Sequence, residues 1–202
     1  YDLRFIIKER LIARLTLKDR LLRIYMLFRN PFRTIEHIAS APDLMGGFII
    51  MIACSIILLG KFLVIIGWYG AKLSSSAILY LLLASLIVEM MLWFSLAIVI
   101  GIAIKIVGGT GSFREILSLV GYTQVYLVVP HVISLVMVAV ASPTSIASGG
   151  VSGASIIYIP FLLMVAFFVG YGVSYTHMLK KFTAISASIS AMVILIFFFY
   201  VL

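Results

Sequence analysis

The sequence predicts an all-helical, polytopic membrane protein with five transmembrane helices and an amphipathic, cytoplasmic helical segment at its N-terminus. The first observation is composition: 64% of residues are hydrophobic and the mean hydropathy is +1.25, whereas soluble domains contain roughly 45–50% apolar residues. The second is charge, because nine of the 15 Lys and Arg residues lie within the first 33 positions. The third is a series of long apolar runs after residue 43, in which Glu89 is the only deeply placed acid.

The N-terminal head, residues 1–43, is predicted to form basic amphipathic helices at the membrane surface. Its apolar side chains recur at the spacing of one helical face. They are Leu17, Leu21, Ile24, Tyr25 and Phe28. Asn30-Pro31 ends this helix, because a proline disfavours helical geometry at the preceding residue, and also begins a second, short helix. Pro42-Asp43 ends that short helix before the first span.

The cations of the head form a candidate surface for lipid or protein. One interpretation is an interfacial helix that lies on the anionic cytoplasmic leaflet and binds lipid headgroups. The other is a docking surface for a protein partner, and the two are compatible. The cations concerned are Arg14, Lys18, Arg20, Arg23, Arg29 and Arg33.

Five apolar runs divide the predicted membrane domain, residues 44–202. A spanning helix needs about 20 mostly apolar residues. The predicted spans cover residues 44–66, 77–107, 115–141, 154–175 and 182–202. At about 1.5 Å per residue, the second span is longer than a bilayer is thick and must tilt or project. The uncharged Ser- and Gly-rich connection at 142–153 predicts a flexible external loop.

The charges in the connections predict how the chain is oriented. With a cytoplasmic N-terminus, 13 Lys and Arg residues face the cytoplasm and two, Lys61 and Lys72, face the outside. The positive-inside rule therefore predicts a cytoplasmic N-terminus, an external C-terminus and an odd number of spans. We expect no nucleic-acid partner, because the chain is too apolar for one.

A candidate intramembrane polar site is centred on Glu89, which lies near mid-bilayer. A carboxylate there costs roughly 2.5–3.5 kcal/mol on insertion scales, so it must face the bundle, be protonated or be hydrogen-bonded. Gly121 and Pro130 predict a kinked or broken third span that lines a cavity. The site comprises Glu89, Tyr122, Gln124, Tyr126 and His131. Either these groups anchor helices by hydrogen bonds or they form a proton- or cation-linked transport site.

Other small and reactive residues predict packing rather than chemistry. Cys54, the single cysteine, is expected to be a buried small side chain. Without Cys/His ligand spacing or a catalytic motif, the sequence predicts no metal, no cofactor and no enzymatic activity. Gly170 with Ser174, and Ala184 with Ser188, have the small-xxx-small spacing that permits close helix approach.

Three features together resemble the Yip family, membrane proteins named for their interaction with Ypt/Rab GTPases. They are NPFRTIEHIASAP at 30–42, GGTGSFREILSLVGYTQVYLVVP at 108–130, and a five-span layout with Lys180-Lys181 before the last span. The resemblance covers roughly residues 28–202. It implies a five-helix membrane domain with a cytoplasmic N-terminus and, in eukaryotes, vesicle traffic through partners. Some prokaryotic members accompany ABC-type exporters, and the compact, Ile-rich sequence is typical of a prokaryotic, archaeal source.

The expected function is that of a non-enzymatic integral membrane scaffold or accessory protein. Such a protein acts through anionic lipids, another membrane protein or a second copy of itself, in the cell membrane if the source is prokaryotic. The alternative is a carrier for a small molecule, ion or lipid, with a polar cavity around Glu89 and the third span. Five spans provide no inverted repeat, the usual basis of secondary transporters, which favours the scaffold.

Overall fold

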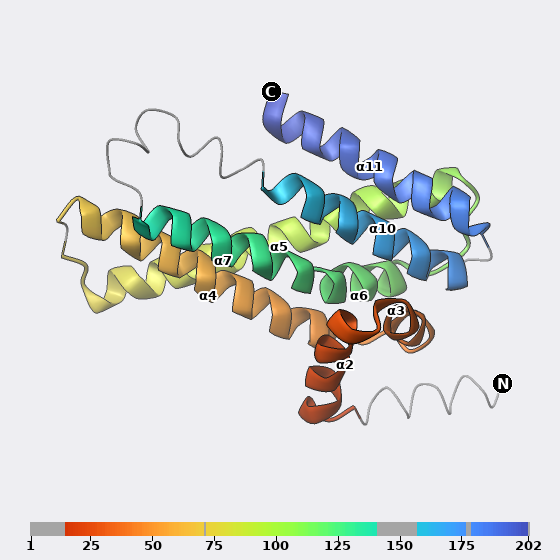
Figure 1. Ribbon diagram of the computed structural model, residues 1–202, viewed down its shortest axis with the longest axis horizontal. Coiled ribbons are helices and arrows are strands. Elements are labelled where there is room, and N and C mark those ends of the chain that lie inside the picture. Colours follow the sequence, from red (N-terminus) through yellow and green to blue (C-terminus); the bar gives the residue numbers. More distant parts are fainter. Residues whose placement is uncertain (1–14, 71, 141–156, 177–178, 202) are drawn as a thin grey trace.

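The computed structural model describes residues 15–70, 72–140, 157–176 and 179–201, with the last five described by backbone alone. Every regular element in these residues is a helix and none is a strand, which confirms the all-helical class. Figure 1 shows the long helices running along one common direction, with two short helices gathered at one end.

The elements follow one another as an N-terminal helix pair and a bundle. Their bounds are α2 Leu17–Arg29, α3 Pro31–Ser40, α4 Leu44–Trp68, α5 Ser75–Ile106, α6 Phe113–Thr123, α7 Val125–Val140, α10 Tyr158–Thr176 and α11 Lys181–Val201. Helices α4, α5, α6 with α7, and α10 provide four segments long and apolar enough to cross a membrane. Helix α11 adds a shorter apolar segment, Lys181–Ile196. Four of the five predicted spans therefore meet this criterion. The loop predicted at 142–153 lies outside the described residues.

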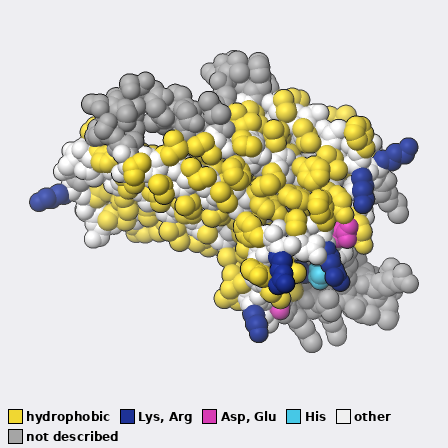
Figure 2. Space-filling view, viewed as in Figure 1, with side chains coloured by type: hydrophobic (Ala, Val, Ile, Leu, Met, Phe, Trp, Pro, Cys, Tyr) yellow, Lys and Arg dark blue, Asp and Glu magenta, His cyan; other side chains and the backbone are white. Residues whose placement is uncertain are grey.

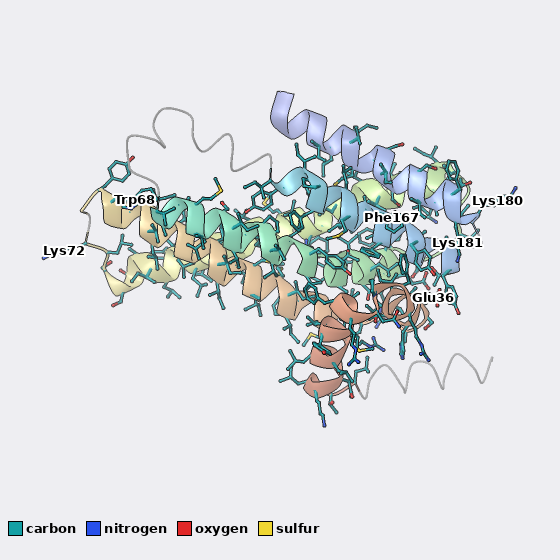
Figure 3. All side chains as sticks on the ribbon, viewed as in Figure 1. Glu36, Trp68, Lys72, Phe167, Lys180 and Lys181 are labelled. Atoms are coloured by element: carbon teal, nitrogen blue, oxygen red, sulfur yellow. The ribbon has the colours of Figure 1, made fainter. Side chains whose placement is uncertain are left out.

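The surface of the bundle is that of a membrane protein. Figure 2 shows hydrophobic side chains over the middle of the molecule and charged side chains toward its ends. In Figure 3, Trp68 and Lys72 mark one end, whereas Glu36, Lys180 and Lys181 mark the other. An exposed apolar surface of this extent is typical of contact with lipid.

The helix starts follow the capping signals in the sequence. Thr16 Oγ1 accepts a hydrogen bond from the Asp19 N–H, and the Asp19 carboxylate accepts one from the Thr16 N–H, at 3.3 and 2.9 Å. These bonds form a capping box. The bonds that the Asp19 carboxylate accepts from the Thr16 hydroxyl and the Thr16 N–H lower the pKa of Asp19. Ser112 and Glu115 form a second capping box at α6. Asn30 occupies the N-cap of α3, but its side chain makes no capping bond.

The third predicted span is divided into α6 and α7 at Gln124. The predicted irregularity is present, and Pro130 lies inside α7 without ending it. Gly121 has a different role from the predicted one, because a Cβ there would lie 2.9 Å from the Gly47 Cα. Gly121 therefore permits close packing of α6 against α4 rather than loosening the backbone.

Helices α10 and α11 pack closely at Gly170. A Cβ at this position would lie 2.7 Å from the Ile185 Cα and 2.8 Å from the Ala184 carbonyl oxygen. Ala184 and Ser188 are fully buried at the same contact. The close approach predicted from the small-residue spacing is thus confirmed here.

The head helices share the hydrophobic core of the bundle. Leu27 of α2 and Ile35, Ile38 and Ala39 of α3 are fully buried, and α3 packs against α10 and α6. A division of the chain into a head (1–43) and a membrane domain (44–202) stays a prediction. In the described residues the two parts bury one continuous set of apolar side chains.

Candidate functional site

The first of two buried polar groups joins the head to the end of the bundle, and is called the Asp43 cluster (Arg20, Asp43, Ser118 and Tyr122). Arg20 Nε donates to Asp43 Oδ2 at 2.9 Å, and the Tyr122 hydroxyl donates to the same oxygen at 3.0 Å. The Asp43 N–H donates to Ser118 Oγ at 3.0 Å. The Asp43 carboxylate also accepts two bonds from the first backbone N–H groups of α4, as its N-cap.

Asp43 is ionised at neutral pH although it is only 4% exposed. Burial raises the pKa of its carboxyl group, but the hydrogen bonds from Arg20 and Tyr122 and the charge of Arg20 outweigh burial. The pKa of Asp43 therefore lies below its ordinary value of 3.8. Both carboxylate oxygens are engaged, so the cluster offers no free ligand atom on Asp43 and serves to fix the head.

Further contacts hold the head against the bundle. The Tyr126 hydroxyl donates to the Leu27 carbonyl oxygen at 2.9 Å. Arg23 Nη1 donates to the Ala41 carbonyl oxygen at 3.1 Å, within the head itself. The Tyr171 hydroxyl of α10 donates to Glu36 Oε1 of α3 at 2.5 Å. Because these bonds connect several helices, α2 and α3 are fixed relative to the bundle.

The six cations singled out in the head therefore divide by role. Arg20 and Arg23 are half-buried and make hydrogen bonds within the chain. Lys18, Arg29 and Arg33 are exposed. The sixth, Arg14, lies outside the described residues.

The second buried polar group lies in the middle of the bundle and is called the Glu89 cluster (Cys54, Glu89 and His131). These residues come from α4, α5 and α7, and their sulfur, oxygen and nitrogen ligand atoms all lie within 4.8 Å of one another. His131 Nε2 is 3.5 Å from Glu89 Oε1. Cys54 is ten residues into α4, or about 15 Å from its start. This depth is near the centre of a hydrocarbon core about 30 Å thick.

A chain of polar side chains continues from the Glu89 cluster toward the Trp68 end of α4. The Tyr158 hydroxyl is 3.0 Å from His131 Nδ1. Lys61 Nζ donates to the Tyr158 hydroxyl and to Ser134 Oγ, both at 3.3 Å. Lys61 is seven residues beyond Cys54 on α4, and it interacts electrostatically with Glu89.

The two neighbours of Glu89 on its own helix face do not satisfy its carboxylate. Ser85 and Trp93 are buried beside it, as the i−4 and i+4 spacing predicts. However, Ser85 Oγ donates to the Leu81 carbonyl oxygen, and Trp93 Nε1 donates to the Leu117 carbonyl oxygen. Helix α5 therefore supplies packing around Glu89 and not its hydrogen bonds.

Several polar atoms in this region have no hydrogen-bond partner. They include His131 Nε2 and both amide atoms of Gln124. The His131 Nε2 to Glu89 separation of 3.5 Å is longer than a good hydrogen bond. Because buried polar groups are nearly always paired, the unpaired His131 Nε2 has room for a further partner, such as a water molecule or an ion.

The five residues of the predicted intramembrane site are not brought together as one unit. Glu89 and His131 lie side by side. Tyr122 belongs to the Asp43 cluster, Tyr126 is bonded to the head, and Gln124 lies at the α6–α7 junction. The sequence pattern did not indicate Cys54, Lys61 or Tyr158 as part of this region, because no local spacing links residues on separate helices. A lone Lys61 inside an apolar run was the available signal, since intramembrane cations are rare and usually functional.

A lipid-facing helical bundle with a buried polar centre and a fixed basic head defines a polytopic integral membrane protein. The chain matches the family model of the Yip1 domain over residues 24–202, nearly its whole length. It therefore belongs to the Yip1 family, which confirms the resemblance noted from the sequence. No match is found among curated proteins or among solved structures.

Proposed function

We propose that this Yip1-family protein is a non-enzymatic membrane scaffold that acts through its head at the cytoplasmic surface. The observation that carries the proposal is an amphipathic helix, α2, fixed at the end of the bundle with its apolar strip uncovered. The strip consists of Leu17, Leu21, Tyr25 and Phe28, each between 50% and 60% exposed. A helix with such a strip beside cations binds in the interface of an anionic leaflet.

Cations next to the apolar strip suit lipid phosphate groups. Lys18, Arg29 and Arg33 are exposed, and a groove between α2 and α3 is lined in part by Arg23, Arg33 and His37. In Figure 2 the head carries dark blue and cyan side chains next to a hydrophobic surface. Helix α2 also runs across the bundle direction in Figure 1, so it can lie in the plane of the membrane. Guanidinium groups bind phosphate by paired hydrogen bonds.

The proposal also covers the orientation of the chain in the membrane and the partners of the head. The excess of Lys and Arg in the head and its neighbouring connections supports a cytoplasmic N-terminus and an external C-terminus. A fixed platform of apolar and cationic groups also suits another membrane protein or a second copy of the chain. A prokaryotic source, and an association with an exporter, stay predictions.

Photocrosslinking in the native membrane tests this function. Benzoylphenylalanine replaces Tyr25 of the apolar strip or, as a matched control, Met91, a 64% exposed residue of α5. We expect lipid adducts at both positions. A discrete protein adduct at Tyr25 alone would instead identify the strip as a partner surface. The absence of any adduct at Tyr25, with lipid adducts at Met91, would contradict a head that acts in the membrane interface.

The Glu89 cluster and its link to Lys61 support a second candidate, a proton- or cation-linked carrier. Buried ionisable side chains inside a bundle are typical of ion pathways. Glu89→Gln should then abolish a flux across reconstituted vesicles while expression and thermal unfolding stay normal. A change in thermal stability alone would count against the carrier.

A further inference from the structure

We propose that Cys54, Glu89 and His131 form a binding site for a transition-metal dication, with Zn²⁺ as the best-suited ion. This site is separate from the head through which the scaffold acts. It combines one sulfur, one carboxylate oxygen and one imidazole nitrogen, each from a different helix. Thiolate and imidazole ligands favour Zn²⁺ over Mg²⁺ and Ca²⁺, which prefer oxygen ligands alone.

The separations fit a tetrahedral ion with three protein ligands. Zinc bonds of about 2.0–2.3 Å place neighbouring ligand atoms about 3.3–3.6 Å apart. His131 Nε2 and Glu89 Oε1 are already 3.5 Å apart. The widest pair, at no more than 4.8 Å, must close by at most about 1.2 Å to meet that geometry. Rotation of the three side chains must supply this movement on metal binding.

The orientation of His131 is an independent indication of a ligand. Its Nδ1 is bonded to the Tyr158 hydroxyl at 3.0 Å. Its Nε2 points into the cluster without a hydrogen-bond partner, and the residue is only 6% exposed. Metal-ligating histidines have this arrangement, with one nitrogen held by an outer partner and the other on the metal.

The charges of the three ligands match a dication. On binding, the Cys54 thiol gives up its proton to solvent and the thiolate forms the sulfur bond. A thiolate, the Glu89 carboxylate and Zn²⁺ are together neutral, which suits the apolar surroundings. Lys61 adds one positive charge, and it interacts electrostatically with Glu89. An anion such as hydroxide or chloride in the fourth position of the ion would balance Lys61.

Cobalt binding tests the site directly, because a thiolate on Co²⁺ gives a charge-transfer absorption band in the near ultraviolet. The full chain is purified in detergent through a tag without histidines, stripped with a chelator and titrated with Co²⁺. Zn²⁺ is then added as a competitor. The chain has a single cysteine, so a thiolate band can come only from Cys54. We expect a saturable band at one ion per chain that Zn²⁺ abolishes.

Substitutions distinguish this site from binding elsewhere. Cys54→Ser should abolish the thiolate band, while Glu89→Gln and His131→Gln should weaken Co²⁺ binding by more than tenfold. Tyr158→Phe should weaken it by about 10-fold, the cost of losing an outer-shell partner. His37→Asn removes an exposed histidine of the head and serves as the control that leaves binding unchanged.

The Lys61→Met variant should bind Co²⁺ more tightly than the wild type, a result that misfolding would not produce. Lys61→Met removes the nearby positive charge, so Co²⁺ should bind about tenfold more tightly. A wild-type protein without a thiolate band would overturn the proposal. So would a band that survives Glu89→Gln and His131→Gln unchanged, or an affinity that falls with Lys61→Met. None of these results depends on the head, so the scaffold function is tested separately.

Discussion

The Asp43 cluster and the Glu89 cluster both bury a carboxylate among helices, yet they differ in how completely that carboxylate is paired. Asp43 accepts bonds from Arg20, Tyr122 and the start of α4. Glu89 lies 3.5 Å from His131, whose Nε2 has no hydrogen-bond partner. A fully paired buried carboxylate holds helices together, whereas the contact between Glu89 and His131 is longer than a good hydrogen bond.

Depth in the membrane accounts for this difference. Asp43 lies at the end of the bundle, where the head brings a guanidinium and a helix start to it. Glu89 lies at mid-bilayer, where hydrogen-bond partners must come from other spans. Helix α5 surrounds Glu89 with Ser85 and Trp93, but both donate to backbone carbonyl groups instead. The fold therefore pairs Asp43 with several donors, whereas helix α5 provides no hydrogen bond to Glu89.

The largest expected effect is the loss of the Asp43 charge. Asp43→Asn keeps an N-cap residue but breaks an ion pair whose Arg20 side chain is 19% exposed. The expected loss of unfolding free energy is therefore about 3 kcal/mol, the lower end of the range for a buried pair. Chemical unfolding in detergent measures the loss. The matched control is Asp19→Asn, which removes an exposed capping-box carboxylate. Equal losses in the two variants would mean that the Asp43 cluster does not fix the head.

The second-largest loss of stability is expected from a substitution at Gly121, which packs against α4 beside the Asp43 cluster. A Cβ at Gly121 would lie 2.9 Å from the Gly47 Cα and 3.0 Å from the Trp93 ring. Gly121→Ala should therefore cost about 1–3 kcal/mol, as overpacking does. Gly67→Ala is the control, because no atom lies within 4 Å of its added Cβ. If both variants unfold at the same temperature, α4 and α6 do not depend on close approach.

Glu89→Gln sharpens the comparison, because it should change stability less than Asp43→Asn. The substitution keeps the size of the side chain and breaks no short hydrogen bond, so we expect a change within about 1 kcal/mol. Thermal unfolding in the absence of metal measures it. A loss as large as that of Asp43→Asn would show that both clusters are structural.

The smallest expected effect is on how the unfolding free energy changes at acidic pH. The pKa of folded Asp43 lies below 3.8, so its stabilisation is present above that value and is lost as pH falls through the lower folded pKa. Between about pH 5 and pH 3, the wild type should lose more unfolding free energy than Asp43→Asn. Parallel stability curves for the two proteins would contradict the ionised state of Asp43.

Local sequence patterns predicted the helices better than the sites. The proline breaks, the apolar runs and the small-residue spacing depend on neighbouring residues, so the helix positions and the close contact at Gly170 were predictable. Contacts between distant helices were not. Nothing in the sequence indicates that Arg20 bonds to Asp43 or that Cys54 meets His131, because these pairs form only when the bundle packs. For that reason the hydrogen bonds of Arg20 and Arg23 within the chain could not be predicted.

The most direct test of the contrast between the two clusters is the stabilisation that Zn²⁺ gives to three proteins. At 100 times its dissociation constant, a ligand raises the unfolding free energy by about 2.7 kcal/mol. We expect this increment in the wild type and in Asp43→Asn, although the latter starts from a lower stability. Because metal binding is weakened more than tenfold in Glu89→Gln, that variant should gain less than about 1.4 kcal/mol at the same Zn²⁺ concentration. A full increment in Glu89→Gln, or its loss in Asp43→Asn alone, would contradict the assignment of structure to one cluster and binding to the other.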